Sequence, residues 1–208
     1  MRIYIFRHGE TAYNVKGVMQ GWLDMPLNEN GRALAEATGR AMKGIKFDRC
    51  ITSPLIRAKE TAEIILKYSE NSTPITVDDR LKEINFGRFE GKSLAEMGDA
   101  GRLFFSDPLR SGRFPGGESV EDLCARTQQL LRELTARGGD GTYLISTHGC
   151  AARAMVNFLY DDRYDFWRGH APYNCSATVV DAENGAAVIT ETDKVFYDKS
   201  LITDHFRR

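Results

Sequence analysis

Apolar residues in this chain form short runs that alternate with longer stretches of helical spacing. The short runs indicate strands, and the last two lie on either side of the turn Glu183-Asn184-Gly185, which predicts a hairpin. The expected strands are Arg2–Phe6, Phe47–Thr52, Ile75–Val77, Tyr143–Ser146, Ala177–Asp181 and Ala187–Thr192.

Apolar positions three and four residues apart predict helices between these strands. Their starts carry the usual signals: a small polar capping residue, a proline at the first helical position, or a capping box. The expected helices run from Asn28 to about Lys43 before Gly44, from Ser53-Pro54 onward, from Ser119 onward with Asp122 as capping-box partner, and over Ala151–Leu159.

Strands that alternate with helices favour a mostly parallel central sheet covered by helices on both faces. We therefore expect an α/β fold, a three-layer sandwich. Segment Gly87–Pro115 departs from the pattern because it is rich in glycine and charge, and we expect it to pass over the top of the domain. The sequence shows no internal repeat or linker, so residues 1–208 are expected to form a single domain.

Composition excludes several classes of protein. A hydrophobic content of 42% and a charged content of 27% are ordinary for a soluble globular protein. The net charge of -1 supplies no general attraction for nucleic acid, and no apolar run approaches the ~20 residues that span a bilayer. We see no leader sequence and no C-x-x-C pair among Cys50, Cys124, Cys150 and Cys175, so we expect a cytoplasmic protein with reduced thiols. The sequence leaves a homo-oligomer open.

Basic side chains follow three of the predicted strands. Arg7 and His8 end the first, Arg57 lies on the helix after the second, and His148 follows the fourth. Because the carboxyl ends of parallel strands meet at one edge of a sheet, we expect these four side chains to converge. Arginine suits phosphate oxygens, and neutral imidazole is a competent nucleophile, so the predicted guest is a phosphoryl group.

A poor alkoxide leaving group also needs an acid. Glu83 and Glu90 both lie near Gly87, and the spacing favours Glu83.

The sequence resembles the histidine phosphatase superfamily, in its phosphoglycerate mutase-like branch. Seven blocks in the family's order carry the resemblance: RHGETAYN (Arg7–Asn14), QGWLDMPLNENG (Gln20–Gly31), SPLIRAKETA (Ser53–Ala62), LKEINFGRFEG (Leu81–Gly91), GGES (Gly116–Ser119), STHG (Ser146–Gly149) and NCS (Asn174–Ser176). They span nearly the whole chain. The resemblance implies a three-layer α/β sandwich with a small helical cap, which fits segment 87–115.

The same resemblance implies roles for individual residues. His8 would be the phosphohistidine nucleophile, with Arg7, Arg57 and His148 holding the phosphoryl group and Glu83 as proton donor. No metal and no cofactor are implied, and the partner would be a small phosphorylated metabolite. The implied substrate-binding residues are Asn14, Gln20, Gly21, Asn174 and Cys175.

The sequence argues against a zinc site and against a cysteine phosphatase. The histidines and nearby carboxylates could hold zinc, but no H-x-x-x-H or C-x-x-C pair exists and Arg7 would repel a cation. Cys50 lies seven residues before Arg57, one residue too far for the phosphate cradle of a cysteine phosphatase, and Ser53-Pro54 interrupts that stretch.

Some candidates also have purely structural interpretations. Arg57 could pair on the helix surface with Glu60 or Glu63, and Glu118 could cap the long helix. We expect His170 and His205 to be surface or structural residues, and Glu10 and Thr11 to support the loop after the first strand.

A phosphohistidine can pass its phosphoryl group to water or to a second hydroxyl. The second outcome, in a cofactor-dependent phosphoglycerate mutase, needs extra basic residues to hold a bisphosphate. A non-catalytic module that binds phospho-ligands is the alternative of another class, and the presence of His8, His148 and Glu83 argues against it. We favour a phosphatase for small phosphate monoesters, with the mutase as the alternative. The short segment after Glu83 offers the cations Arg88, Lys92, Arg102, Arg110 and Arg113, and the apolar residues Phe86, Phe89, Phe104 and Phe105.

Overall fold

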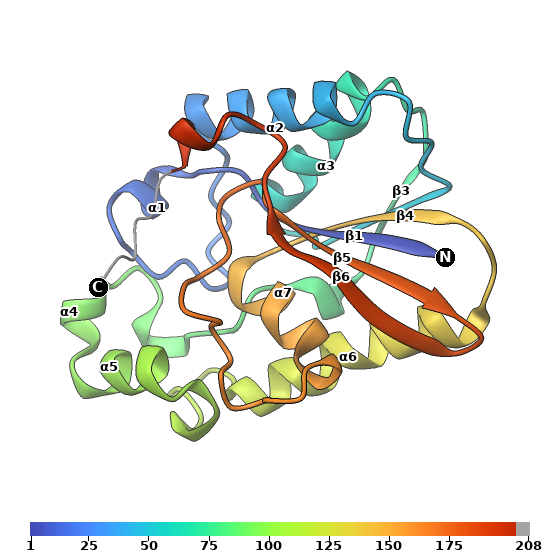
Figure 1. The fold of residues 1–208 in the computed structure, drawn as a ribbon. Coiled ribbons are helices and arrows are strands. Elements are labelled where there is room, and N and C mark those ends of the chain that lie inside the picture. Colours follow the sequence, from blue (N-terminus) through green and yellow to red (C-terminus); the bar gives the residue numbers. More distant parts are fainter. Residues whose placement is uncertain (203–208) are drawn as a thin grey trace.

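A six-stranded sheet forms the centre of the computed structural model, which describes residues 1–202 (Figure 1). His205 lies outside these residues. The strand order is β3-β2-β4-β1-β5-β6, in which β1 to β4 run parallel and β5 and β6 are antiparallel to their neighbours. The strands are β1 (Arg2–Arg7), β2 (Arg49–Thr52), β3 (Ile75–Val77), β4 (Thr142–Thr147), β5 (Ala177–Glu183) and β6 (Ala186–Lys194).

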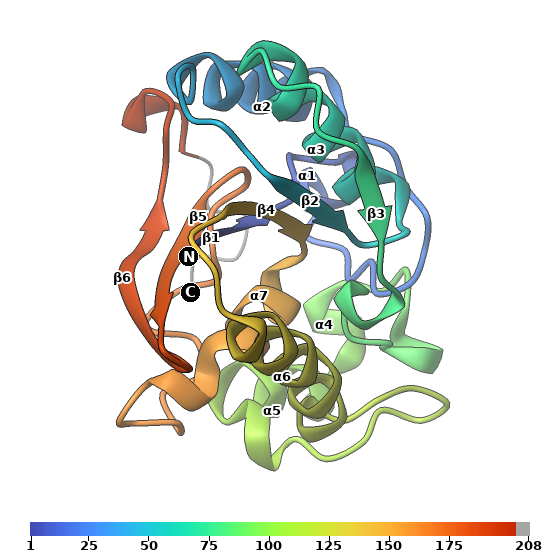
Figure 2. The ribbon, with the colours of Figure 1, turned by 90° about the vertical axis from the view of Figure 1, so that its right-hand side faces the viewer.

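Helices cover both faces of the sheet, with α2 and α3 on one side and α6 and α7 on the other (Figure 2). The alternation along β1 divides the core accordingly, since Tyr4 and Phe6 pack in one apolar cluster and Ile3 and Ile5 in the other. The helices are α1 (Ala12–Val15), α2 (Glu29–Ala41), α3 (Ile56–Tyr68), α4 (Leu94–Met97), α5 (Asp99–Ser106), α6 (Val120–Arg137) and α7 (Gly149–Val156).

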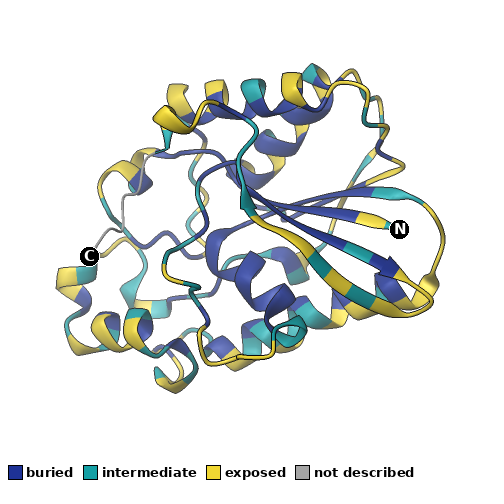
Figure 3. Cartoon of the chain, viewed as in Figure 1, coloured by how far each residue is buried: buried dark blue, intermediate teal, exposed yellow. Residues whose placement is uncertain are grey.

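This architecture confirms the predicted α/β sandwich. The central strands are buried on both faces, whereas β6 exposes much of its length (Figure 3). No helix within residues 1–202 is both long and apolar enough to cross a membrane.

The predicted start of the second helix at Ser53 is wrong, because α3 begins at Ile56. The Ser53 hydroxyl lies 2.8 Å from Nε2 of His148 and accepts only a long bond, 3.3 Å, from the Leu55 amide. The carboxylate of Asp24 instead accepts the amide of Ile56, at 2.6 Å. A residue from a distant part of the chain thus provides the acceptor for one unpaired N–H in the first turn of α3.

Segment 87–115 contains the short helices α4 and α5 and lies beside α6 on the lower side of the molecule in Figure 1. Phe104 and Phe114 from this segment pack edge to face with Phe86, with ring centroids 5.1–5.4 Å apart. The same cluster includes Leu123 of α6 and Ala154 of α7, so the segment has an apolar anchor on the helical layer.

Two backbones meet closely behind the end of β1. A Cβ on Gly9 would lie 2.6 Å from the carbonyl oxygen of Gly31, and a Cβ on Gly31 would overlap the carbonyl oxygen of Glu10. Glycine at both places therefore allows α2 to support the loop that carries His8.

We expect Gly31→Ala to lower the free energy of unfolding by about 1–3 kcal/mol, because backbone atoms cannot move aside as a flexible side chain would. Urea denaturation measures the change. Ala33→Ser, at an exposed position of the same helix, is the control and should stay within ~0.5 kcal/mol of the parent. An unchanged unfolding midpoint for Gly31→Ala would contradict the close contact.

Candidate active site

Parallel pairing of β1 with β4 brings His8 and His148 together. The register sets Arg7 opposite Thr147, so each histidine follows its strand at the same height. The two ring centroids are 5.2 Å apart, and both residues are buried. Arg7 and Arg57 are buried beside them and line the same cavity.

The imidazole of His8 has a defined tautomer. Its Nδ1 lies 2.6 Å from the carbonyl oxygen of Gly9, and because a carbonyl can only accept, Nδ1 carries the proton. Nε2 is then left with its lone pair. Burial, followed by the charges of Arg57 and Arg7, lowers the pKa of His8 well below 6.5, so the ring is neutral at neutral pH.

His148 contacts Ser53 through Nε2, while its Nδ1 is buried without a hydrogen-bond partner among residues 1–202. Burial and then the Arg57 charge hold the pKa of His148 well below its usual 6.5. A buried ring nitrogen without a partner costs free energy, which suits a site that awaits a polar ligand.

Arg57 is fully buried and bonds only to backbone in the described structure. Its two terminal nitrogens donate to the carbonyl oxygens of Leu23, at 2.7 Å, and Gly21, at 2.8 Å. The alternative pairing with Glu60 or Glu63 is therefore wrong. Burial lowers the pKa of Arg57 to about 10, which leaves it charged at neutral pH.

The other predicted pocket residues fall into two groups. Asn14, Gln20 and Gly21 line the cavity together with His8, Arg7 and Arg57, whereas His148 is not among the described residues that line it. Asn174 and Cys175 lie behind the β1 end, where the Asn174 side chain donates to the His8 carbonyl at 3.0 Å and the Cys175 amide donates to the Arg7 carbonyl at 3.1 Å. These two residues do not line the cavity, and their role in substrate binding stays a prediction.

Thr11 and Glu10 support the loop after β1. The Thr11 hydroxyl lies 3.1 Å from Oδ1 of Asn14 and 3.0 Å from Oε1 of Gln20. The Glu10 carboxylate accepts the side-chain amides of Asn28 and Asn30, so it ties this loop to the start of α2.

Glu83 lies at the rim of the cavity, against the first turn of α7. Its carboxylate accepts the amides of Ile84 (2.9 Å), Ala151 (3.0 Å) and Cys150 (3.1 Å). His148 is the N-cap of this helix but makes no side-chain cap bond, so Glu83 satisfies the orphan donors instead. Glu90 is outside the cavity lining, where it accepts the Trp22 amide.

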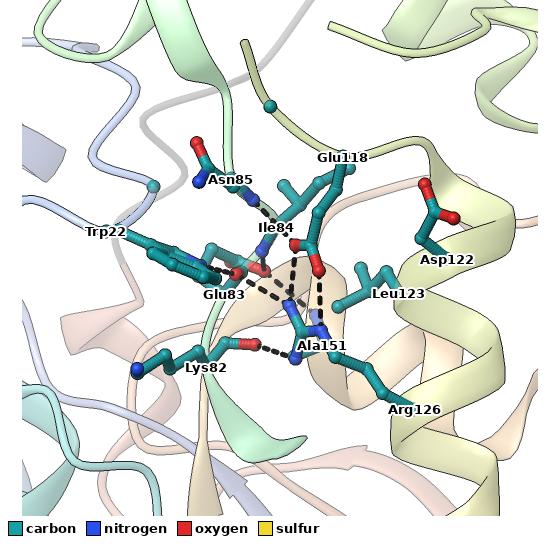
Figure 4. A network of polar contacts seen from close by, with 12 residues as sticks. Trp22, Lys82, Glu83, Ile84, Asn85, Glu118, Asp122, Leu123, Arg126 and Ala151 are labelled. Atoms are coloured by element: carbon teal, nitrogen blue, oxygen red, sulfur yellow. Dashed lines mark hydrogen bonds and ion pairs between the residues drawn. The ribbon is translucent and has the colours of Figure 1, made fainter. Parts of the chain in front are cut away.

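The structure also brings in residues that sequence reasoning missed or misplaced. Ser53 orients His148, and Trp22 donates from Nε1 to the carbonyl oxygen of Glu83 at 2.8 Å. Glu118 does not cap α6, since Ser119 and Asp122 form that capping box; it pairs with Arg126 next to Glu83 (Figure 4). The (i, i+8) spacing of Glu118 and Arg126 was visible in the sequence but points to no contact by itself.

Two observations bear on the zinc site and the cysteine nucleophile weighed as alternatives. Within residues 1–202, no three His, Cys, Asp or Glu side chains gather in a way that could hold a metal ion. Cys50 is buried in the core, and burial raises the pKa of its thiol to about 12, so it is not a thiolate nucleophile.

The neutral histidines make stability depend on pH. Folding lowers the pKa of both rings, so below about pH 6.5 the unfolded chain binds protons that the folded chain does not. The free energy of unfolding is therefore unaffected by the titration of these two histidines above about pH 6.5 and decreases below it. We expect the free energy of unfolding to fall between about pH 7 and about pH 5.5. Denaturation of His8→Gln/His148→Gln should show a flatter dependence; an equally steep one would contradict two neutral buried rings.

Comparison with known proteins gives a consistent result. Residues 3–194 match the family model of the histidine phosphatase superfamily (branch 1). A 2,3-bisphosphoglycerate-dependent phosphoglycerate mutase of Methylobacterium sp. is 36% identical over 168 residues, which cover 76% of this chain and 79% of the relative.

Solved structures agree. YhfR of Bacillus stearothermophilus superposes with a TM-score of 0.86 at 31% identity, over 93% of this chain and 97% of that one. A mycobacterial glucosyl-3-phosphoglycerate phosphatase has a TM-score of 0.75 at 29% identity, over 86% and 89%. The resemblance inferred from the motifs is confirmed: the chain belongs to branch 1 of the histidine phosphatase superfamily and is an enzyme of this group, whose members are phosphatases or mutases.

Proposed function

We propose that this enzyme is a phosphatase, which hydrolyses small phosphate monoesters through a phosphohistidine on His8. The observation that carries the proposal is the composition of the cavity. Of the described residues that line it, Arg7 and Arg57 are the only cations. Beside the polar side chains of His8, Asn14, Gln20 and Glu83, the wall is largely apolar, and its apolar part comprises Val18, Met19, Phe86, Phe104, Phe105, Cys150, Trp167 and Ala171.

A bisphosphate or phosphoglycerate would carry a second anionic group into this apolar wall. Burying such a charge without a partner costs several kcal/mol (~3–5). None of the five cations considered from the sequence lines the cavity. Arg102, Arg110 and Arg113 pair with Asp99, Asp107 and Asp122. Arg88 is exposed, and Lys92 lies over the ring of Phe89. Water is therefore the better supported acceptor.

The first step places Nε2 of His8 in line with the phosphorus, forming a P–N bond while the P–O bond to the alcohol breaks. Glu83 gives a proton to the departing oxygen, Arg7 and Arg57 balance the charge on the phosphoryl oxygens, and neutral His148 donates a hydrogen bond to one of them. In the second step water attacks phosphorus, the P–N bond breaks, and the Glu83 carboxylate takes the water's proton. The enzyme returns to its starting state.

A phosphate-release screen tests the reaction class. Aryl phosphates, alkyl phosphates, phosphoglycerates and nucleotides are assayed with and without 2,3-bisphosphoglycerate. We expect free phosphate from esters of apolar alcohols and no isomerisation of 3-phosphoglycerate. Bisphosphate-dependent formation of the 2-isomer would establish the mutase instead, and binding of phosphate esters without turnover would favour a binding module.

The nucleophile has its own test. His8→Ala should reduce turnover by at least about 10⁴-fold, since loss of a covalent nucleophile has effects of this size. Labelled substrate should leave an acid-labile, base-stable phosphoryl group on the parent protein and none on the variant. An alkali-labile adduct would assign the nucleophile to another residue type.

Trp167 should select the alcohol part of the substrate. Its ring stacks on Phe105 with centroids 5.4 Å apart, and its Nε1 donates to the carbonyl oxygen of Phe104. We expect Trp167→Ala to raise KM for naphthyl phosphate by about 10-fold or more, the usual value of lost apolar contact, with a smaller change for glycerol phosphate. Tyr164→Ala, at a 75% exposed position of the same loop, should change neither value. Equal increases for both substrates would contradict an apolar subsite.

A further inference from the structure

The segment that carries Glu83 has no regular secondary structure to hold it. Residues 82–86 lie between two short 3₁₀ turns, Asp79–Leu81 and Gly87–Phe89. Neither sheet nor helix hydrogen bonds fix these backbone groups, so their position depends on partners from elsewhere in the chain.

Arg126 of α6 supplies the main partners. Its Nη1 donates to the carbonyl oxygens of Arg80 and Lys82, both at 2.7 Å, and its Nη2 donates to that of Glu83 at 2.9 Å. One guanidinium thus holds three carbonyls within four residues of chain, up to Glu83, which lines the cavity. Figure 4 shows Arg126 beside Lys82 and Glu83.

Glu118 completes the arrangement from the other side. Its two carboxylate oxygens accept Nε and Nη2 of Arg126, at 2.9 and 2.8 Å, and one of them also accepts the Asn85 amide at 2.9 Å. The Glu118 amide in turn donates to the Asn85 carbonyl at 2.9 Å. All five N–H donors of the guanidinium are therefore used, in a pair whose side chains are each only 17% exposed.

Glu83 itself is held at both its backbone carbonyl and its side-chain carboxylate. Its backbone carbonyl accepts Trp22 as well as Arg126, and its carboxylate accepts three amides, two of them from α7. Trp22 lies between Gly21 and Leu23, whose carbonyls bind Arg57. The contacts of Arg126 are therefore continuous with those that place the phosphate-binding arginine.

We propose that Arg126 and Glu118 are positioning residues that hold the Glu83 carboxylate where it can exchange a proton with the ester oxygen. The inference rests on the proposed phosphatase reaction. A general acid contributes about 10²–10⁴-fold, and a displacement of about 1 Å can cost about 10²-fold. The planar fork matters here, because a lysine ammonium keeps the charge but cannot reach three carbonyls and a carboxylate at once.

Charge and geometry can be separated experimentally. Arg126 also contributes to the low pKa of His148, so a purely electrostatic role is the competing explanation. Arg126→Lys keeps the charge and removes the fork, whereas Arg126→Met removes both. Arg132→Lys is the matched control on the same helix, where the guanidinium lies over the ring of Phe158, 4.3 Å from its centroid, rather than on the Glu83 segment.

The measurement is kcat/KM over a series of phosphate esters, from nitrophenyl to simple alkyl alcohols. We expect Arg126→Lys to lose about 10²-fold on alkyl esters and less than about 3-fold on nitrophenyl phosphate, whose leaving group needs little protonation. Glu118→Gln should shift in the same direction and Arg132→Lys should match the parent. A retained kcat/KM for nitrophenyl phosphate, which reports the first chemical step, shows that each variant is folded.

A double variant tests whether Arg126 acts through Glu83. Glu83→Gln should show the same selective loss, and Glu83→Gln/Arg126→Lys should lose no more than Glu83→Gln alone. Losses that are equal across the ester series, that add in the double variant, or that occur in Arg126→Met but not in Arg126→Lys would overturn the positioning role and leave the phosphatase intact. A parent protein that releases no phosphate from any ester would overturn the proposed function, and this inference with it.

Discussion

The site depends on the parallel register between β1 and β4, two strands that are far apart in sequence but adjacent in the sheet. The register places Arg7 beside Thr147, and the His8 amide extends the ladder by one bond to the Thr147 carbonyl. Both imidazoles then leave their strands at one height. A slip of one residue would turn the strand's side chains to the opposite faces and separate the rings, because side chains along a strand alternate.

This register brings buried arginine and histidine side chains together at one site. Arg57 is buried with backbone carbonyls as its hydrogen-bond partners, and burial lowers its pKa to about 10. Burial first, and then the charge of Arg57, lowers the pKa of His8 and His148 and keeps both rings neutral. Such a cluster costs stability when empty and gains it when an anion enters, which is the condition under which a preorganised site favours a phosphoryl group.

Around this centre, support comes from segments that are remote in the chain. Gly31 lies against the loop that carries His8, Ser53 contacts His148, and the Glu118–Arg126 pair holds the backbone that carries Glu83. Each contact holds a functional residue through its backbone or through side-chain atoms that would not meet the substrate. The atoms that would react therefore stay free. In the proposed reaction, the apolar wall with Trp167 would limit which alcohols fit beside the phosphoryl group.

The sequence by itself determined the order of the strands and long helices along the chain, the helical layers, and the two strand ends at which Arg7, His8 and His148 lie. These features depend on periodicity and on a general property of parallel sheets, both of which act over a few residues. The capping box at Ser119 was equally predictable, because its partners are three residues apart.

Only the tertiary structure decided where Ser53, Glu118 and Arg57 direct their polar groups. Ser53 has the pattern of a helix cap, yet its hydroxyl lies against a histidine 95 residues away. Glu118 could serve the helix beside it, but its carboxylate binds Arg126 and the Asn85 amide. A local pattern shows which partners are within reach along one element; packing decides which carbonyls and amides from other elements are left to be satisfied there.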